Sequence, residues 1–234
     1  MIFSSKEYEK DVDTIENHQH PDLFFAGISW KCRPRSKSVN YKIPVIRKKG
    51  ASIPNFTVIL DIDNTLISGS FLIGGGYDFP IFLKYPGYVT TVYIKKRNHL
   101  DDFLRNLTKF ARVCIYTSSE SVYADQIIDQ LDPEGVIFEQ IKYRTSCIPA
   151  KYGLYIKDIS IFKTELAHTV LVDDAPYFAY KYPSRTLKIP KFMGENDDFL
   201  VTALFYLKKL SQTPDVAKEL SNRNKYTFYY LLTS

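Results

Sequence analysis

Several residue types that define particular protein classes are scarce in this chain. Among its 234 residues there are three cysteines, four histidines and one tryptophan. Cys32, Cys114 and Cys147 form an odd and widely scattered set. Such a set argues against a disulfide scaffold and against a cysteine-rich zinc site. It favours an intracellular reducing compartment, nuclear or cytoplasmic.

Long apolar runs are also lacking. Charges interrupt every apolar stretch before it reaches the roughly 20 residues that a membrane-spanning helix requires. The first seven residues lack the basic-then-apolar order of a secretory signal. The length fits one domain, or a domain plus an arm, with a sizeable core. Nothing in the pattern indicates a particular oligomeric state.

Acidic residues are absent from one basic stretch. Residues 31–49 contain eight Lys or Arg and no Asp or Glu, in a chain with a formal net charge of +5. Three interpretations stay open: a solvated linker, a nuclear-import or polyanion-binding patch, and a structured basic surface. We expect residues 1–50 to form a basic, partly flexible arm and residues 51–234 the folded domain. Apolar patches at 23–30 and 226–232 are expected to pack on that domain.

What the chain does have is an apolar strand that ends in carboxylates. Residues 58–60 are apolar and rich in β-branched side chains, which predicts a short buried strand. Asp61 and Asp63 follow directly, and then Asn64 and Thr65. Buried carboxylates need a charge partner, a metal ion or dense hydrogen bonding to remain ionised. A polar turn after the strand is the alternative interpretation.

The rest of the chain supplies similar strands alternating with helices. Apolar segments at 113–117, 136–141 and 169–174 predict strands, and 123–131 and 197–210 predict helices. Asn98 is expected to cap another helix, whose apolar face carries Leu100, Phe103, Leu104, Leu107 and Phe110. Segments 79–85 and 88–94 alternate like a small antiparallel β insertion. The pattern predicts an α/β fold, with a Rossmann-like parallel sheet and helices on both faces.

Polar side chains follow three of these strands. Ligands of such sheets bind at the carboxyl ends of the strands, so Asp61 and Asp63, Thr117, and Asp173 and Asp174 should converge. Four carboxylates in one pocket call for a hard divalent cation, with Mg2+ the default. With Lys157 and the Thr117 hydroxyl added, the pocket suits a phosphoryl group that one carboxylate attacks. Taken alone, Lys157 also fits a surface lysine, and Thr117 or Ser119 a helix N-cap.

These residues carry a family pattern. Asp61-x-Asp63-x-Thr65, Thr117, Lys157 and Asp173-Asp174 resemble, in order, the four motifs of the haloacid dehalogenase superfamily. Further segments narrow the resemblance: the Lys96-Arg97 pair, residues 116–119, 123–125, 131–133, 143–147 and 155–160, and Asp173-Asp-Ala-Pro176. They are similar to the phosphatase branch that acts on the C-terminal domain of RNA polymerase II. Asn64 stands where that branch usually has Glu, and Asp174 where it usually has Asn.

The resemblance implies a role for each position. Asp61 is expected to be the nucleophile that forms an aspartyl-phosphate, and Asp63 the general acid and base. Mg2+ is expected on the Asp63 backbone carbonyl and on the Asp61, Asp173 and Asp174 side chains. Thr117 and Lys157 are expected to hold phosphoryl oxygens. Thr65, Ser118 and Arg144 are expected beside the substrate.

The intervals between the motifs bear on the substrate. Neither 65–117 nor 117–157 leaves room for the large cap domain that closes the site in superfamily members acting on small molecules. The expected substrate is therefore a phosphorylated protein or peptide, including phosphoserine-Pro segments. Two alternatives remain: a phosphatase or phosphotransferase for small molecules, and a catalytically silent binding module of the same branch.

Overall fold

A five-stranded parallel sheet forms the centre of the computed structural model, which describes residues 54–73, 76–175 and 181–223. The predicted arm at 1–50 and the apolar patches at 23–30 and 226–232 lie outside the described residues. The strand order is β10-β9-β1-β5-β6. The strands are β1 (Thr57–Leu60), β5 (Arg112–Tyr116), β6 (Phe138–Lys142), β9 (Thr169–Asp173) and β10 (Thr186–Lys188).

The order of these strands indicates that a ligand site lies at the carboxyl end of β1. After β1 the chain builds β5 and then β6 on one side, and it later returns to add β9 and β10 on the other. The four strand pairings are parallel, so all the carboxyl ends lie on the same edge. A sheet whose order reverses around a central strand has its crevice at that strand's carboxyl end. For this chain, that end is Asp61.

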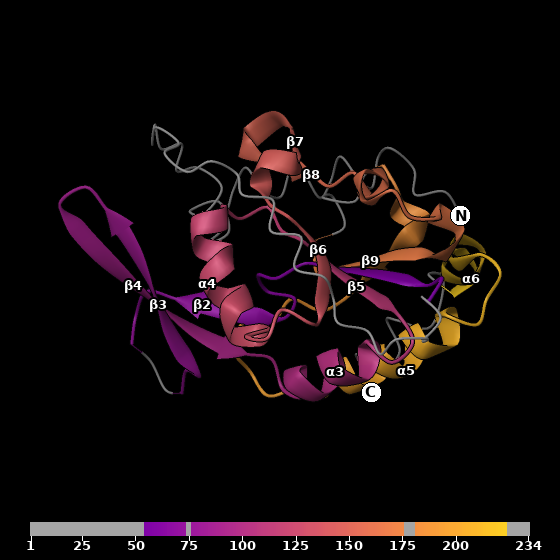
Figure 1. Cartoon of the computed structure of the whole chain (residues 1–234), viewed down its shortest axis with the longest axis horizontal. Coiled ribbons are helices and arrows are strands. Elements are labelled where there is room, and N and C mark those ends of the chain that lie inside the picture. Colours follow the sequence, from indigo (N-terminus) through magenta and orange to yellow (C-terminus); the bar gives the residue numbers. More distant parts are fainter. Residues whose placement is uncertain (1–53, 74–75, 176–180, 224–234) are drawn as a thin grey trace.

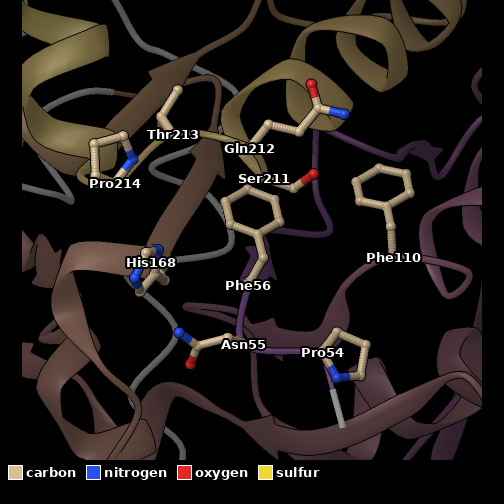
Figure 2. Close-up of a pocket in the computed structure, with 9 residues that line it drawn as sticks. All are labelled: Pro54, Asn55, Phe56, Phe110, His168, Ser211, Gln212, Thr213 and Pro214. Carbon is tan, nitrogen blue, oxygen red and sulfur yellow. The ribbon is translucent and has the colours of Figure 1, made fainter. Parts of the chain in front are cut away.

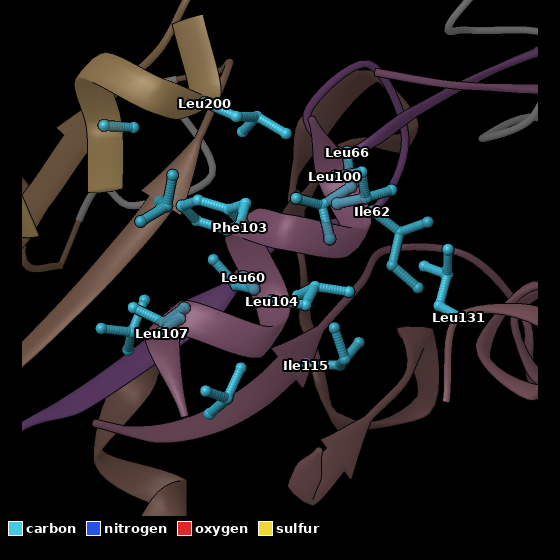
Figure 3. Packing of buried hydrophobic residues seen from close by; sticks show 14 of the residues in the cluster. Leu60, Ile62, Leu66, Leu100, Phe103, Leu104, Leu107, Ile115, Leu131 and Leu200 are labelled. Atoms are coloured by element: carbon cyan, nitrogen blue, oxygen red, sulfur yellow. The ribbon is translucent and has the colours of Figure 1, made fainter. Parts of the chain in front are cut away.

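Helical segments cover both faces of the sheet. Val58 and Leu60 face the larger apolar cluster, together with buried residues of α3 (Leu100–Leu107), α4 (Ser121–Leu131), α5 (Phe199–Leu210) and α6 (Val216–Arg223). Figure 3 shows Leu60 and Ile115 among the apolar side chains of α3, and Leu200 of α5 in the same cluster. Ile59 faces the opposite side, where the short helix η3 (Ile159–Phe162) packs. Two buried faces explain why β1 is apolar throughout.

A separate three-stranded antiparallel sheet follows the first motif. Its order is β2 (Ile67–Ser70), β4 (Tyr88–Lys96) and β3 (Phe79–Tyr85). In Figure 1 it projects from one end of the main sheet, while α6 lies at the other end. We call residues 67–96 the insert. Gln126 of α4 fastens the insert, because its side-chain amide exchanges hydrogen bonds of 2.9 and 3.0 Å with the backbone of Phe82.

The remaining short elements carry the last motifs toward the sheet. They are η1 (Arg144–Ser146), β7 (Ile148–Pro149), η2 (Lys151–Gly153), β8 (Tyr155–Ile156), η4 (Leu166–His168) and η6 (Pro183–Arg185). The predicted α/β class and the small β insertion are confirmed, and the described residues hold no large cap. No helix among them is long and apolar enough to cross a membrane.

One local prediction was wrong. Asn98 was expected to cap the helix at α3, but the N-cap residue is His99, and its side chain makes no capping hydrogen bond. His99 has φ 64°, in the left-handed region, and its imidazole Nε2 lies 3.0 Å from Asp198 at the start of α5. The residue at the N-cap of α3 therefore also contacts the start of α5, which is distant in sequence. The local sequence pattern around Asn98 did not indicate this.

Candidate active site

The tips of β1 and β9 bring two carboxylates together. The strands pair in parallel with Leu60 opposite Val172, and the backbone NH of Asp61 donates to Val172 O at 3.0 Å. Asp61 is 5% exposed and Asp173 is fully buried. The structure therefore brings Asp61 and Asp173 together, as the sequence predicted, and these two acids need a counter-charge.

Lys157 supplies that charge. It follows β8 and is fully buried, so it is not a surface lysine. Its Nζ lies 2.5 Å from Asp61 Oδ1 and 2.7 Å from Asp173 Oδ2. Burial alone would lower the lysine pKa, but the charges of Asp173 and Asp61 outweigh it and raise that pKa above its usual value. The ammonium therefore stays charged between the two acids.

A third carboxylate completes an oxygen-rich cluster. One side-chain oxygen each from Asp61, Asp173 and Asp174 can be chosen so that all lie within 4.8 Å of one another. Asp174 is oriented by Thr65, which donates from its hydroxyl to Asp174 Oδ1 at 3.3 Å and accepts from Asp174 N at 3.2 Å. Burial, with the nearby charge of Asp61, raises the pKa of Asp173 to about 6 despite Lys157. Three hard oxygen donors with excess negative charge fit a divalent cation such as Mg2+.

Asp63 lies outside that cluster and is held differently. Tyr123 Oη donates to Asp63 Oδ1 at 2.6 Å, and Ser119 Oγ donates to Oδ2 at 2.7 Å. Burial, and then the charge of Asp61, raise the pKa of Asp63 from 3.8 to about 6, against the two hydroxyl hydrogen bonds. A carboxyl group with this pKa can exchange a proton near neutral pH.

The loop after β5 carries Thr117 and Ser118. Thr117 is buried, and its hydroxyl accepts from Ser119 N at 3.0 Å. The N-cap of α4 is Glu120, so neither Thr117 nor Ser119 has that role. Arg144 Nε donates to Ser118 O at 2.6 Å, and its Nη1 to Glu120 at 3.1 Å. Arg144 therefore fastens this loop, and the expected substrate contacts of Thr65, Thr117, Ser118 and Arg144 stay predictions.

Two residues named in the sequence analysis support the site in a way that the sequence did not predict. Asn64 has φ 58°, a left-handed conformation that Asn tolerates better than most residues. It exchanges hydrogen bonds with Phe192, from Nδ2 to O at 3.1 Å and from Phe192 N to Asn64 O at 2.7 Å. Arg97 is 1% exposed, and its Nη1 donates to Thr65 O and to Pro190 O at 3.1 Å each. Both residues join the first motif to the loop before α5.

A hollow elsewhere in the molecule is not part of this site. Its volume is about 440 Å³, and Phe56, Phe110, His168 and Pro214 are among the residues that line it. Figure 2 shows these side chains around the start of β1, at the amino end of the sheet. None of the clustered carboxylates lines it. The carboxylate cluster lies at the opposite edge of the sheet, where the strands have their carboxyl ends.

A parallel sheet that reverses at β1, with carboxylates and a buried lysine at its carboxyl edge, fits the phosphatase class of the haloacid dehalogenase superfamily that the motifs resemble. Residues 56–217 match the model of the NLI interacting factor-like phosphatases. The chain belongs to that family.

Named relatives agree with this assignment. A Dictyostelium discoideum protein, "Probable C-terminal domain small phosphatase", is 34% identical over 161 residues, 68% of this chain and 52% of the relative. Human "Carboxy-terminal domain RNA polymerase II polypeptide A small phosphatase 1" is 30% identical over 184 residues, 78% of this chain and 69% of that protein. The chain thus spans about half the length of the first relative and more of the second.

Solved structures share the fold. Fission yeast RNA polymerase II CTD phosphatase Fcp1, bound to beryllium fluoride, matches with a TM-score of 0.51 at 20% identity, over 70% of this chain and 54% of that chain. A second Fcp1 structure matches with a TM-score of 0.50 at 22% identity, over 70% and 52%. At this identity the likeness concerns the fold alone.

Proposed function

We propose that this chain is a Mg2+-dependent protein serine/threonine phosphatase that acts through an aspartyl-phosphate. One observation carries the proposal. The buried Lys157 joins Asp61 to Asp173, while Asp63, two residues from Asp61, is held apart with a raised pKa. The carboxylate proposed as nucleophile is therefore paired with a buried ammonium group, and its neighbour is able to carry a proton. Such a division of roles is what acid–base-assisted phosphoryl transfer requires.

In the first step an oxygen of Asp61 attacks phosphorus and forms the new O–P bond. The bond to the serine or threonine oxygen breaks, its electron pair stays on that oxygen, and Asp63 supplies the proton. In the second step water attacks the phosphorus of the aspartyl-phosphate and gives its proton back to Asp63. The Asp61 carboxylate leaves, and inorganic phosphate is released. In this proposal Thr117 and Lys157 hold phosphoryl oxygens during both steps.

The metal completes the charge balance. Asp61, Asp173 and Asp174 would hold Mg2+ through side-chain oxygens, and Asp63 through its backbone carbonyl. When bound, Mg2+ would offset the negative charge of the phosphoryl group. Lys157 then neutralises the remaining carboxylate charge, and Thr65 keeps Asp174 oriented through its two hydrogen bonds.

The described residues hold no large cap over the site, and this favours a polypeptide substrate over a metabolite. The aromatic side chains of the insert then matter, because they would contact such a substrate. Among the aromatic side chains of the insert, Phe79 and Tyr85 pack partly against the core. Tyr88 lies eight residues from Lys96, roughly 26 Å along an extended strand, too far to touch a residue next to the phosphoserine. Phe82 is 50% exposed but pairs with Thr91, five residues from Lys96. Phe71 and Tyr77 are exposed by 41% and 42% and lie near the end of β2.

The ring of Tyr77 lies 4.8 Å from that of Tyr93, which pairs with Ser70 of β2. The site end of the insert therefore carries an aromatic surface. Aromatic surfaces suit Pro-containing segments, which are already extended and lose little entropy on binding. We propose that a Pro following the phosphoserine packs there.

The test compares kcat/KM among phosphorylated substrates with Mg2+ present. A phosphoserine-Pro peptide should be preferred to its phosphoserine-Ala counterpart, and both to sugar phosphates and nucleotides. Asp61→Asn is the background control. Preference for a metabolite over every phosphopeptide would identify a small-molecule phosphatase. Binding of phosphopeptides without turnover by the unsubstituted chain would identify a silent binding module.

We also propose an intracellular reducing compartment, nuclear or cytoplasmic, as the place of action. Cys114 and Cys147 are free, buried thiols. Burial raises the pKa of Cys114 to about 12, which makes it unreactive. A chain that keeps its described cysteines as core thiols does not depend on an oxidising environment.

A further inference from the structure

Two hydroxyl groups from different parts of the fold hold the carboxylate of Asp63. Tyr123 belongs to the first turn of α4 and reaches Oδ1 at 2.6 Å. Ser119 lies in the loop before that helix and reaches Oδ2 at 2.7 Å. A carboxylate with both oxygens bound to groups fixed on other elements cannot rotate about its terminal torsion without losing a hydrogen bond.

These contacts leave room for the proton. Each carboxylate oxygen has two acceptor positions. One hydroxyl occupies one position on each oxygen, so a second position stays available on either side. The arrangement therefore sets the plane of the carboxyl group while Asp63 can still carry and release a proton.

The insert makes a space for the Tyr123 hydroxyl. Gly69 of β2 faces Tyr123, and a Cβ atom added at Gly69 would lie 3.1 Å from Tyr123 Oη. Such a contact is tighter than a side-chain carbon and a hydroxyl oxygen normally allow, so the hydroxyl would have to shift. Gly69 has no positive φ that would otherwise require glycine. The missing side chain instead permits a close approach.

We propose that Tyr123 is a positioning residue for Asp63, and that Gly69 provides the clearance that lets it act. This inference rests on the proposed function, because it concerns the group that protonates the leaving oxygen. Ser119 orients the other oxygen. The helix α4, the insert and the first motif are thereby joined at one hydroxyl group.

The first test varies the leaving group. The kcat/KM value covers only the steps up to departure of the leaving group. 4-Nitrophenolate leaves without a proton, whereas phenolate and a serine alkoxide need one. Tyr123→Phe should lower kcat/KM about tenfold or more for phenyl phosphate and a phosphoserine peptide, and less than about threefold for 4-nitrophenyl phosphate. Tyr123→Phe should thus lower the ratio of kcat/KM for phenyl phosphate to kcat/KM for 4-nitrophenyl phosphate. Ser119→Ala should lower this ratio as well, and Ser119→Thr, which keeps a hydroxyl, should restore it.

A matched control is present in the chain. Tyr143 Oη donates to Asp125 of α4, also at 2.6 Å, but on the exposed side of the helix. Tyr143→Phe removes the same kind of hydrogen bond and should leave the ratio between substrates unchanged. Equal losses on all substrates in Tyr123→Phe would overturn the proposal, because general damage does not select for the leaving group.

The second test combines Gly69→Ala with Tyr123→Phe. If the added methyl group acts by displacing the Tyr123 hydroxyl, Gly69→Ala should lower the ratio of kcat/KM for phenyl phosphate to that for 4-nitrophenyl phosphate in the chain that keeps Tyr123. It should have little effect on this ratio in Tyr123→Phe, where the hydroxyl is gone. Additive effects would mean that Gly69 acts elsewhere and would contradict the clearance argument. Melting temperatures of all variants identify loss of folding. Failure of the proposed function looks different, since the unsubstituted chain would then release no phosphate from any phosphopeptide.

Discussion

Lys157 donates a 2.5 Å hydrogen bond to Asp61, across 96 positions of sequence. The contact engages Oδ1 of the carboxylate and leaves Oδ2 for the attack on phosphorus that we propose. It also gives a carboxylate side chain that is 5% exposed a buried counter-charge. Asp61 is thus fixed in place by one buried ammonium group.

Asp61→Asn should reduce turnover to background, because an amide is not a nucleophile toward phosphorus. The side-chain oxygen can still accept from Lys157, so the fold should persist. Phosphate release and the melting temperature with and without Mg2+ measure the two effects. Asp129→Asn, an exposed position on α4, is the control. Wild-type kcat in Asp61→Asn would contradict the assignment of the nucleophile.

Metal removal should abolish activity reversibly. EDTA is expected to stop turnover and added Mg2+ to restore it, since Asp61, Asp173 and Asp174 then share a cation. Ca2+ should substitute poorly, because it takes more ligands at longer distances and would displace the nucleophile from phosphorus. The measurement is phosphate release during titration with each ion. Full activity in chelator would exclude the metal site.

The rate should depend on pH through Asp63. Burial and the charge of Asp61 raise its pKa from 3.8 to about 6, and bound Mg2+ would cancel part of the second effect. Asp63 donates only when protonated, so kcat/KM for a phosphoserine peptide should fall by about tenfold per unit as the pH rises above that pKa. 4-Nitrophenyl phosphate needs no proton and should show no such fall. The same decline for both substrates would point to another group.

The ion pair behind the site should stabilise the fold. Arg97 Nε lies 3.0 and 2.9 Å from the two oxygens of Asp197, and Arg97 is 1% exposed. Asp197→Ala leaves a buried guanidinium without its carboxylate and should cost about 3 kcal/mol in urea unfolding. Asp102→Ala, which removes the partner of Arg105 in a pair exposed by about 70%, should cost less than about 0.5 kcal/mol. Equal costs would show that burial of the pair is irrelevant.

Deleting residues 1–50 should leave phosphatase activity and the melting temperature unchanged. The family match begins at residue 56, and the eight basic side chains of 31–49 lie before it. Retention on a heparin column should fall, because those charges would bind a polyanion. A lower melting temperature would instead show that Phe24, Phe25 and Trp30 contribute to the core.

Strand periodicity and the paired aspartates were enough to predict the sheet and the convergence of Asp61 with Asp173. Both follow from rules on where parallel strands end. The contacts of Asp63 with Ser119 and Tyr123 were not predictable in this way. They depend on side-chain directions at three separate elements, which residue spacing does not specify.

Arg97 and Asn64 show a second limit. An arginine is rarely buried, so a Lys-Arg pair after a strand gave no reason to expect a guanidinium packed over the rings of Phe192 and Phe199. Asn64 departs from the usual Glu of its relatives, and the sequence could not say why. Its left-handed backbone and the hydrogen bond from its side-chain Nδ2 to Phe192 O give the departure a structural role.

The insert leaves and rejoins the main domain at one point. Ile67 pairs with Lys96 where it begins and ends, and Arg97 N donates to Leu66 O at 2.9 Å across the junction. Beyond Gly69, which gives Tyr123 its clearance, a segment whose two ends are already fastened side by side can be exchanged for another of different length without moving Asp61 or Asp63. Evolution, or a protein engineer, can thus replace the outer part of the hairpin and, under the proposed function, change which phosphopeptides are accepted while the bond-breaking apparatus stays the same.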